Sequence, residues 1–256
     1  MKFKKNQVLH IGLLAAMPEE LGNLLGSLIE IRHLNYGDFD LYSGKLQLKN
    51  NNFILITAAW SGWGKVSAAR AATRIIATKY KDMQIDFLLF SGVAGAVSQE
   101  LQQWDIIISD KVMQHDMDAR PLFEKFVVPS IKEKEIYADK NLLEIFHKSL
   151  KQINKIEYLY NFGNIYRGLI ATGDMFISDK KKLSKLKKEI PSLLAVEMEG
   201  AAVAQVAYQE NIPWIIIRTI SDEADDNAEN DFNDFLKKYK TLSWALIRYI
   251  LEDISY

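Results

Sequence analysis

Short runs of large apolar side chains restrict the folds open to this chain more than any other feature. Residues 87–90 and 215–217 are apolar at every position. A strand of this kind must be covered on both faces, which is typical of parallel or mixed sheets with helices on either side. Segments of helical periodicity separate these runs along most of the 256 residues. The alternation predicts an α/β layered fold with a largely parallel or mixed sheet.

The expected elements alternate along the whole chain. We expect strands near residues 8–15, 39–47, 53–60, 86–92, 105–109, 166–172, 193–197 and 214–220. We expect helices near residues 18–29, 65–80, 141–152, 179–189, 199–210 and 234–253. The stretch 39–60 has the pattern of an antiparallel hairpin, with Lys49-Asn-Asn-Asn52 as its turn. Because no repeat, linker or shift in composition interrupts the chain, we expect a single domain over residues 1–256.

The composition argues against several classes of protein. The formal net charge is −1, so the overall charge does not favour binding to nucleic acid or to a membrane surface. The chain has no cysteine, which excludes disulfides, thiolate metal sites and cysteine nucleophiles. This usage fits the reducing environment of the cytoplasm. The lysine-rich segment 180–188 has leucines at helical spacing, which predicts a solvated helix face and not a nucleic-acid site.

The N-terminus loosely resembles a secretory signal. Lys2, Lys4 and Lys5 precede an apolar run, as they would in such a signal. We favour a first buried strand instead, because His10 interrupts the run and Pro18 with two glutamates has the pattern of a helix start.

Acidic residues directly follow two of the apolar runs. Glu197 and Glu199 lie where a strand turns into a small-residue helix, and Ser221 and Asp222 follow the run 214–220. Burying an ionised carboxylate costs several kcal/mol unless it is paired. Ligands of open α/β sheets bind at the carboxyl ends of strands. Two strand ends that both deliver acids therefore predict a catalytic cleft.

Arg218 lies on an otherwise apolar strand, where a buried guanidinium needs carboxylate partners. Glu20, Glu199 and Asp222 are the candidates for that role. For Glu20 alone a simpler interpretation is open, because anions are favoured in the first turn of a helix.

Two further patterns are compatible with a small-molecule site. Gly92 and Gly95 permit close approach of a ligand to the backbone, although tight strand-to-helix turns use glycine as well. Their spacing matches neither a dinucleotide fingerprint nor a phosphate loop. Phe176 could stack on a flat heterocycle, although an isolated phenylalanine more often belongs to a core.

Taken together, these segments resemble the 5′-methylthioadenosine/S-adenosylhomocysteine nucleosidases, within the purine nucleoside phosphorylase and nucleosidase superfamily. The matching segments occur in family order: Ile11-Gly-Leu-Leu-Ala-Ala-Met-Pro-Glu-Glu20, Ser61-Gly-Trp-Gly-Lys65, Ser91-Gly-Val-Ala-Gly95, Arg167-Gly-Leu-Ile170 with Gly173-Asp174, Ala195-Val-Glu-Met-Glu199 and Arg218-Thr-Ile-Ser-Asp222. The resemblance implies a nucleoside phosphorylase-like, three-layer α/β/α sandwich around a central twisted mixed β-sheet. It also implies hydrolysis of the N-glycosidic bond between ribose and a purine, with neither a cofactor nor a metal.

The resemblance implies a role for each residue of the site. Asp222 matches the general acid that protonates N7 of the leaving base, and Glu20 matches the carboxylate that activates the attacking water. Glu199 matches the residue that holds the ribose hydroxyls, and Arg218 matches the arginine that orients the acidic network. The other implied substrate-binding residues are Met17, Trp63, Val93, Ala94, Gly95, Phe176, Ile177, Glu197, Met198 and Ser221.

Departures from the family pattern leave the 5′ substituent open. Val93 stands where these nucleosidases commonly have serine, and Trp63 stands where they commonly have a small aliphatic residue. The alternatives are therefore a methylthio, homocysteinyl or futalosine-like substrate. A phosphorylase is less favoured, because a carboxylate at position 20 repels phosphate. A non-catalytic nucleoside-binding protein is also less favoured, because a binder gains little from several costly carboxylates.

The segment His115-Asp-Met-Asp118 resembles the start of the family's dimer-contact loop. The resemblance therefore implies a homodimer, although residues 119–125 depart from the usual pattern. Metal binding by His115, Asp116 and Asp118 is disfavoured. We expect a cytoplasmic enzyme whose partner is a small-molecule nucleoside, with no nucleic acid and no membrane.

Overall fold

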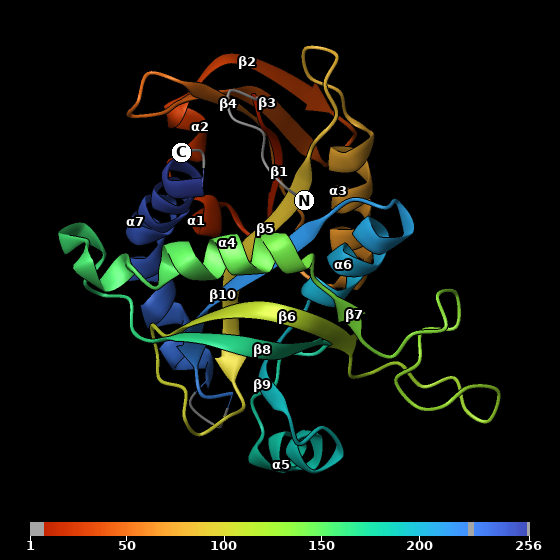
Figure 1. Cartoon of the computed structure of the whole chain (residues 1–256). Helices are drawn as coiled ribbons and strands as arrows, with labels where there is room; N and C mark the ends of the chain where they lie inside the picture. Colours follow the sequence, from red (N-terminus) through yellow and green to blue (C-terminus); the bar gives the residue numbers. More distant parts are fainter. Residues whose placement is uncertain (1–7, 225–227, 255–256) are drawn as a thin grey trace.

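The computed structural model describes residues 8–224 and 228–254 and contains a large mixed sheet with helices on both sides (Figure 1). The strands are β1 His10–Ala15, β2 Leu28–Asn35, β3 Asp40–Gln47, β4 Phe53–Trp60, β5 Phe87–Ala96, β6 Ile106–Gln114, β7 Ile136–Tyr137, β8 Ile165–Thr172, β9 Leu193–Glu197 and β10 Trp214–Asp222. The α-helices are α1 Pro18–Leu21, α2 Leu24–Ser27, α3 Lys65–Ala77, α4 Lys140–Leu150, α5 Lys180–Glu189, α6 Gly200–Gln209 and α7 Ala228–Ile254. Short 3₁₀ turns, η1 Ile153–Lys155 and η2 Glu157–Leu159, follow α4.

Strand pairing brings distant parts of the sequence to one end of the sheet. The strand β5 pairs in parallel with both β1 and β10, and antiparallel with β9. The strand β10 also pairs with β6, β6 pairs with β8, and β8 pairs with β9. Because β9 pairs with β5 in turn, the strands β5, β10, β6, β8 and β9 close into a ring. On the other side of β1, the strands β4, β3 and β2 continue as an open sheet. The ends of β5, β9 and β10 therefore lie together.

The helices cover the sheet from both sides. Figure 1 shows α1 and α7 on one side of the central strands and α3 and α6 on the other. Every position of β1 and of β10 is buried, as expected for strands covered on both faces. The predicted α/β/α architecture around a mixed sheet is confirmed.

The predicted helix over residues 18–29 is wrong as one continuous helix, because the structure has two short helices there, α1 and α2. The helix α1 ends at Leu21, and Gly22 adopts a left-handed φ of 53°, which a continuous helix does not allow. The short helix α2 and the edge strand β2 follow. Most of β2 is solvent-exposed, including Ile29 and Ile31, so its sequence lacks the alternation expected of a half-buried strand.

Most other expected elements are confirmed. The hairpin of β3 and β4 is antiparallel, and Asn51 takes a left-handed φ of 65° in its turn. The two-residue strand β7 was not expected. The last helix starts at Ala228 and not near 234. Its first residues were not predicted as helical because they are rich in charge and lack an apolar period.

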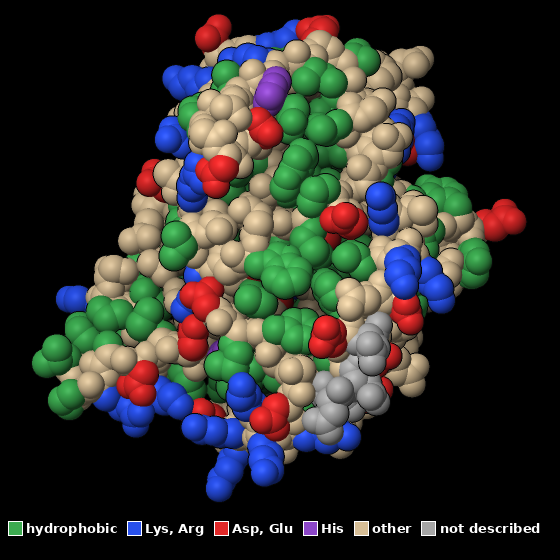
Figure 2. All heavy atoms as spheres, turned by 180° about the vertical axis from the view of Figure 1, so that it is seen from behind, with side chains coloured by type: hydrophobic (Ala, Val, Ile, Leu, Met, Phe, Trp, Pro, Cys, Tyr) green, Lys and Arg blue, Asp and Glu red, His purple; other side chains and the backbone are tan. Residues whose placement is uncertain are grey.

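Two lysine-rich segments were interpreted from the sequence, one near the N-terminus and one at residues 180–188. The apolar run near the start forms β1, whereas Lys2, Lys4 and Lys5 lie outside the described residues. The helix α5 carries the lysine-rich segment and buries only Leu186 among its described side chains, so the solvated face is confirmed. Figure 2 shows Lys and Arg side chains gathered at the lower end of the molecule, where α5 lies in Figure 1. Within residues 8–224 and 228–254, no helix has the length and apolarity needed to span a bilayer.

Candidate active site

The ends of β5, β9 and β10 meet at a pocket with an empty volume of about 580 Å³. Every site residue expected from the sequence lines this pocket, with the exception of Arg218, which is fully buried. The carboxylates of Glu20, Glu199 and Asp222 thus share one cavity. Lining residues that the sequence argument missed are Ala16, Met175, Val196, Ala224 and Phe232.

The backbone fixes the Glu20 carboxylate from two sides of the pocket. Its Oε2 accepts hydrogen bonds from the N–H groups of Ala16 (2.8 Å) and Met17 (2.9 Å), and its Oε1 accepts one from Val93 (3.0 Å). The bond from Met17 also caps the start of α1, so the simpler interpretation of Glu20 as a helix cap holds alongside its place in the pocket. Burial raises the pKa of Glu20, although Arg218 and these donors oppose that rise.

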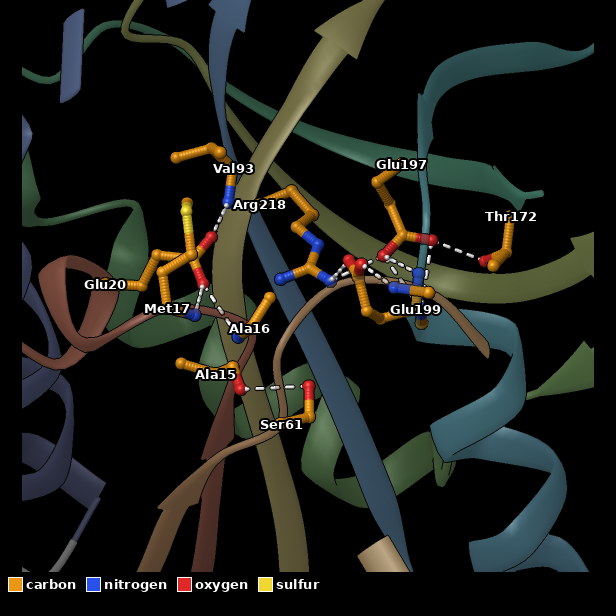
Figure 3. Close-up of polar contacts among 12 residues, drawn as sticks. Ala15, Ala16, Met17, Glu20, Ser61, Val93, Thr172, Glu197, Glu199 and Arg218 are labelled. Carbon is orange, nitrogen blue, oxygen red and sulfur yellow. Dashed lines mark hydrogen bonds and ion pairs between the residues drawn. The ribbon is translucent and has the colours of Figure 1, made fainter. Parts of the chain in front are cut away.

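Arg218 lies between the acidic groups and beneath the pocket. Figure 3 shows Glu20 on one side of its guanidinium and Glu197 with Glu199 on the other. Its Nη2 donates to Glu197 Oε2 at 2.5 Å and lies 3.9 Å from Glu199 Oε2. Its Cζ lies 3.9 Å from the centre of the Phe90 ring, an arrangement that favours a cation.

The expected partners of Arg218 therefore need a correction. Of the candidates Glu20, Glu199 and Asp222, Glu199 is confirmed as an ion-pair partner at 3.9 Å, whereas the partner that accepts a hydrogen bond from Arg218 is Glu197, which was not among them. The reason is the closed part of the sheet: β9 and β10 both pair with β5, which brings position 197 next to position 218. The linear sequence does not reveal this closure.

Glu197 is the most heavily hydrogen-bonded of the acids. Besides Arg218, its carboxylate accepts the Thr172 hydroxyl and the N–H groups of Glu199 (3.1 Å) and Gly200 (2.7 Å). The N–H groups of Glu199 and Gly200 lie at the start of α6, where the helix dipole favours an anion. Because this carboxylate also forms the buried ion pair with Arg218, the geometry favours a positioning role for the side chain.

Glu199 is less fully paired. Its Oε1 accepts one hydrogen bond, from the N–H of Gly64 at 2.8 Å, and the residue is 5% exposed. Burial and the neighbouring Glu197 raise the pKa of Glu199 to about 8, although Arg218 and Gly64 oppose the rise. Its ionisation therefore changes close to neutral pH.

Asp222 is fixed where β10 ends. Its Oδ2 accepts the Ser221 hydroxyl at 2.6 Å, and its Oδ1 accepts the N–H of Ala224 at 2.9 Å. The pairing of β10 with β5 shifts register here, which sets Asp222 opposite Gly95. A Cβ at Gly95 would lie 2.9 Å from Asp222 Oδ1, so glycine leaves room for the carboxylate.

Aromatic side chains form another part of the pocket wall. The Phe232 ring makes edge contacts with Trp63 (6.3 Å between centroids) and with Phe176 (6.0 Å). Trp63 is 56% exposed and Phe176 is 39% exposed, so both rings are open to a ligand. Phe232 was missed because it is an isolated aromatic residue in a charged segment, ahead of the predicted start of the last helix.

The two aspartates considered as metal ligands have other partners. Asp116 forms an ion pair with Lys65, and Asp118 forms one with Arg120. In the described ranges, no group of three or more His, Cys, Asp or Glu side chains is arranged to hold a metal.

Comparisons with known proteins agree with one another. The phosphorylase superfamily matches residues 10–252. The 5′-methylthioadenosine/S-adenosylhomocysteine nucleosidase of Staphylococcus aureus (strain MRSA252) is 34% identical over 229 residues, which is 89% of this chain and 92% of the relative. The structure of the Neisseria meningitidis nucleosidase of the same name, in complex with methylthio-immucillin-A, superposes with a TM-score of 0.82 at 28% identity, covering 96% of this chain and 99% of that one. The futalosine hydrolase of Helicobacter pylori strain 26695 superposes with a TM-score of 0.80 at 28% identity, covering 96% and 98%.

Proposed function

Because the chain belongs to the phosphorylase superfamily and, within it, to the 5′-methylthioadenosine/S-adenosylhomocysteine nucleosidases, we propose that it hydrolyses the N-glycosidic bond of 5′-methylthioadenosine, S-adenosylhomocysteine or both. The products are adenine and the 5-thio-substituted ribose. One observation carries the proposal: Glu20, Glu199 and Asp222, all buried, open into a single pocket above Arg218.

Asp222 is the proposed general acid. Adenine leaves poorly as an anion, so a proton delivered to N7 as the C–N bond breaks lowers the barrier. The hydrogen bonds from Ser221 and Ala224 hold both carboxyl oxygens of Asp222 and so support a fixed direction of proton transfer. A positioned acid of this kind contributes about 10²–10⁴-fold to the rate.

Glu20 and Glu199 are assigned to the sugar side of the reaction. The ribosyl group gains oxocarbenium character as the bond breaks, and nearby carboxylates stabilise that positive charge. Glu199 in its ionised form accepts hydrogen bonds from the ribose hydroxyls. Glu20, fixed by three backbone N–H groups, removes a proton from the attacking water. Arg218 balances the charge of these acids from below.

The charge of the pocket supports water as the nucleophile. Among the described residues that line it, the ionisable side chains are Glu20, Glu197, Glu199 and Asp222, all of them acidic. A phosphate ion entering this pocket would be repelled, whereas a neutral water molecule would not. Hydrolysis is therefore favoured over phosphorolysis. Several buried carboxylates would also be costly in a protein that only binds nucleosides.

The test is release of adenine from 5′-methylthioadenosine, followed by chromatography with and without inorganic phosphate. We expect equal rates in both conditions and free 5-methylthioribose as the second product. Turnover that requires phosphate and yields a sugar phosphate would contradict the proposal. Tight adenine binding without any turnover would also contradict it, and would favour a binding protein.

A futalosine-type activity is the second candidate. The similarity to a futalosine hydrolase and the open aromatic wall at Trp63, Phe176 and Phe232 both favour it, because a larger 5′ group finds apolar contacts there. Values of kcat/KM for 5′-methylthioadenosine, S-adenosylhomocysteine and futalosine, measured side by side, rank the three substrates. A futalosine value far above the other two would replace the first candidate by the second.

A homodimer is part of the proposal. The resemblance of residues 115–118 to the family's dimer-contact loop supports it, and Leu122 in the segment that follows is 84% exposed. Light scattering of the purified protein should give twice the mass of the chain, and the monomer mass would contradict this. Placement in the cytoplasm stays a prediction that cell fractionation tests.

A further inference from the structure

Three charged residues from three separate parts of the chain close a ring of hydrogen bonds beside the pocket. The N–H of Lys65 donates to Asp174 Oδ1 at 2.7 Å, and the N–H of Asp174 donates to Asp116 Oδ2 at 3.0 Å. The ring closes where Lys65 Nζ donates to Asp116 Oδ1 at 2.6 Å. Lys65 begins α3, Asp116 follows β6 and Asp174 follows β8. None of the three lines the pocket.

The residues next to the ring do line the pocket or contact its acids. Directly before Lys65, the N–H of Gly64 donates to Glu199 Oε1, and Trp63 lies in the pocket wall. Directly after Asp174, Met175 and Phe176 lie in the wall as well. The ring therefore connects the loop that carries Trp63 to the loop that carries Phe176.

Glycines flank Trp63 in the loop that precedes the ring. Gly62 and Gly64 take left-handed φ values of 78° and 91°, so the loop makes a tight turn that favours glycine. A Cβ at Gly64 would lie 3.1 Å from Asp174 Oδ1, which shows how closely the two loops approach each other.

We propose that Lys65, Asp116 and Asp174 are positioning residues that hold the Gly64 N–H against Glu199 and fix the two loops of the pocket wall. This inference rests on the proposed nucleosidase function for its effect on turnover. The side chains of Lys65 and Asp116 are only 18% and 27% exposed, so solvent screens their ion pair less than it screens a fully exposed pair. Burial opposes ionisation of Asp116, but the hydrogen bonds from Lys65 and Asp174 outweigh it and lower its pKa.

Loss of the ring has a specific consequence for Glu199. The charged groups that face this carboxyl are Glu197, Glu20 and Arg218, and its backbone donor is Gly64. A donor to the ionised form lowers a carboxyl pKa, so withdrawal of the Gly64 N–H raises the pKa of Glu199 further. The pH at which kcat/KM reaches half of its maximum should then move upward, because kcat/KM reports ionisations of the free enzyme.

The test compares Asp174→Ala with Asp174→Asn in the full-length protein. The asparagine keeps an oxygen that accepts the Lys65 N–H, whereas the alanine does not. We expect Asp174→Ala, Asp116→Ala and Lys65→Met to lower kcat/KM about tenfold, the effect of losing one hydrogen bond to a charged group. In all three, the midpoint of the pH profile should also rise. Asp174→Asn should stay close to the wild type.

Lys111→Met is the matched control, because Lys111 pairs with Glu135 at 2.9 Å with similar exposure but lies outside the pocket. It should leave kcat/KM and the pH profile unchanged. The proposal is overturned if Asp174→Ala keeps the wild-type pH profile, or if Asp174→Asn is as impaired as Asp174→Ala.

Amide hydrogen exchange separates this inference from the proposed function. In Asp174→Ala the amides of residues 62–65 should exchange at least about tenfold faster than in the wild type, and they should be unchanged in Lys111→Met. If the wild type releases no adenine, the proposed function fails, and the exchange rates still decide whether the ring holds the Gly64 N–H. Unchanged exchange in Asp174→Ala overturns the inference whatever the activity.

Discussion

A methyl group added at Gly92 should disable the site without unfolding the protein. A Cβ at this position would lie 2.1 Å from Arg218 Nη1 and 2.5 Å from Glu20 Oε1. Gly92 belongs to β5 and does not have a left-handed φ, so the backbone accepts alanine. The substitution Gly92→Ala therefore tests whether Arg218 and Glu20 must approach each other across this strand.

The size of the effect follows from these two distances. Ordinary contact between heavy atoms needs about 3.5 Å, so the guanidinium must retreat by roughly 1.4 Å and the carboxylate by roughly 1 Å. Both groups are buried, and Glu20 is held by three backbone donors, so neither can move freely. A displacement of about 1 Å at a catalytic group costs about 10²-fold. We expect kcat/KM to fall by at least that factor, or about 2.7 kcal/mol.

The assay is adenine release from 5′-methylthioadenosine, with thermal unfolding measured in parallel. Gly168→Ala is the control, because a Cβ there meets only the flexible end of Leu194 and Gly168 lies outside the pocket. The control should keep most of the wild-type kcat/KM. A Gly92→Ala protein with near-normal turnover would refute the argument that Arg218 and Glu20 act as one unit.

Three further predictions concern the acids of the pocket. Asp222→Asn should lower kcat by at least about 10², the low end for one general acid, and should still bind adenine in a calorimetric titration; near-normal kcat would remove Asp222 from that role. The pKa of Glu199 is raised to about 8, so its carboxyl is neutral below that pH and ionised above it. If the ionised form holds the ribose, kcat/KM should rise with pH through about 8, and a midpoint near the ordinary 4.5 would contradict the assignment. Glu197→Gln leaves Arg218 buried without its direct anionic partner and should destabilise the protein by about 3 kcal/mol or more in denaturant unfolding. Glu189 forms a more exposed ion pair with Lys125, so Glu189→Gln should lower the free energy of unfolding by less than about 1 kcal/mol. Equal losses in the two variants would argue against a structural role for the buried pair.

The parts of the fold that the sequence predicts are those whose side chains report burial directly. The strands β5 and β10 are apolar at nearly every position because both of their faces are covered, and this pattern is visible in the chain. The strand β2 escaped prediction because it lies at the sheet edge, with a register shift between Ile29 and Arg32 and a left-handed Glu30. Gly22 ends α1 through its backbone conformation, which the apolar pattern around it does not encode.

In the candidate site, too, the residues with a local signal in the sequence were predicted and those placed by strand pairing were not. Glu199 and Asp222 were found because acids at the ends of apolar strands are costly to bury, whereas the role of Glu20 came from the resemblance to the nucleosidases. The pairing of Arg218 with Glu197 depends on the closed ring of strands, which has no local signal in the sequence. Phe232 lines the pocket from the first part of α7, which starts earlier than its apolar period indicates.

A crystal structure of Asp222→Asn with 5′-methylthioadenosine bound tests the roles of the acids most directly. We expect purine N7 within hydrogen-bond distance of position 222, the ribose hydroxyls on Glu199, and a water molecule between Glu20 and the anomeric carbon. A nucleoside bound outside this pocket, or bound with its base against Glu20, would contradict the assignment of the acids.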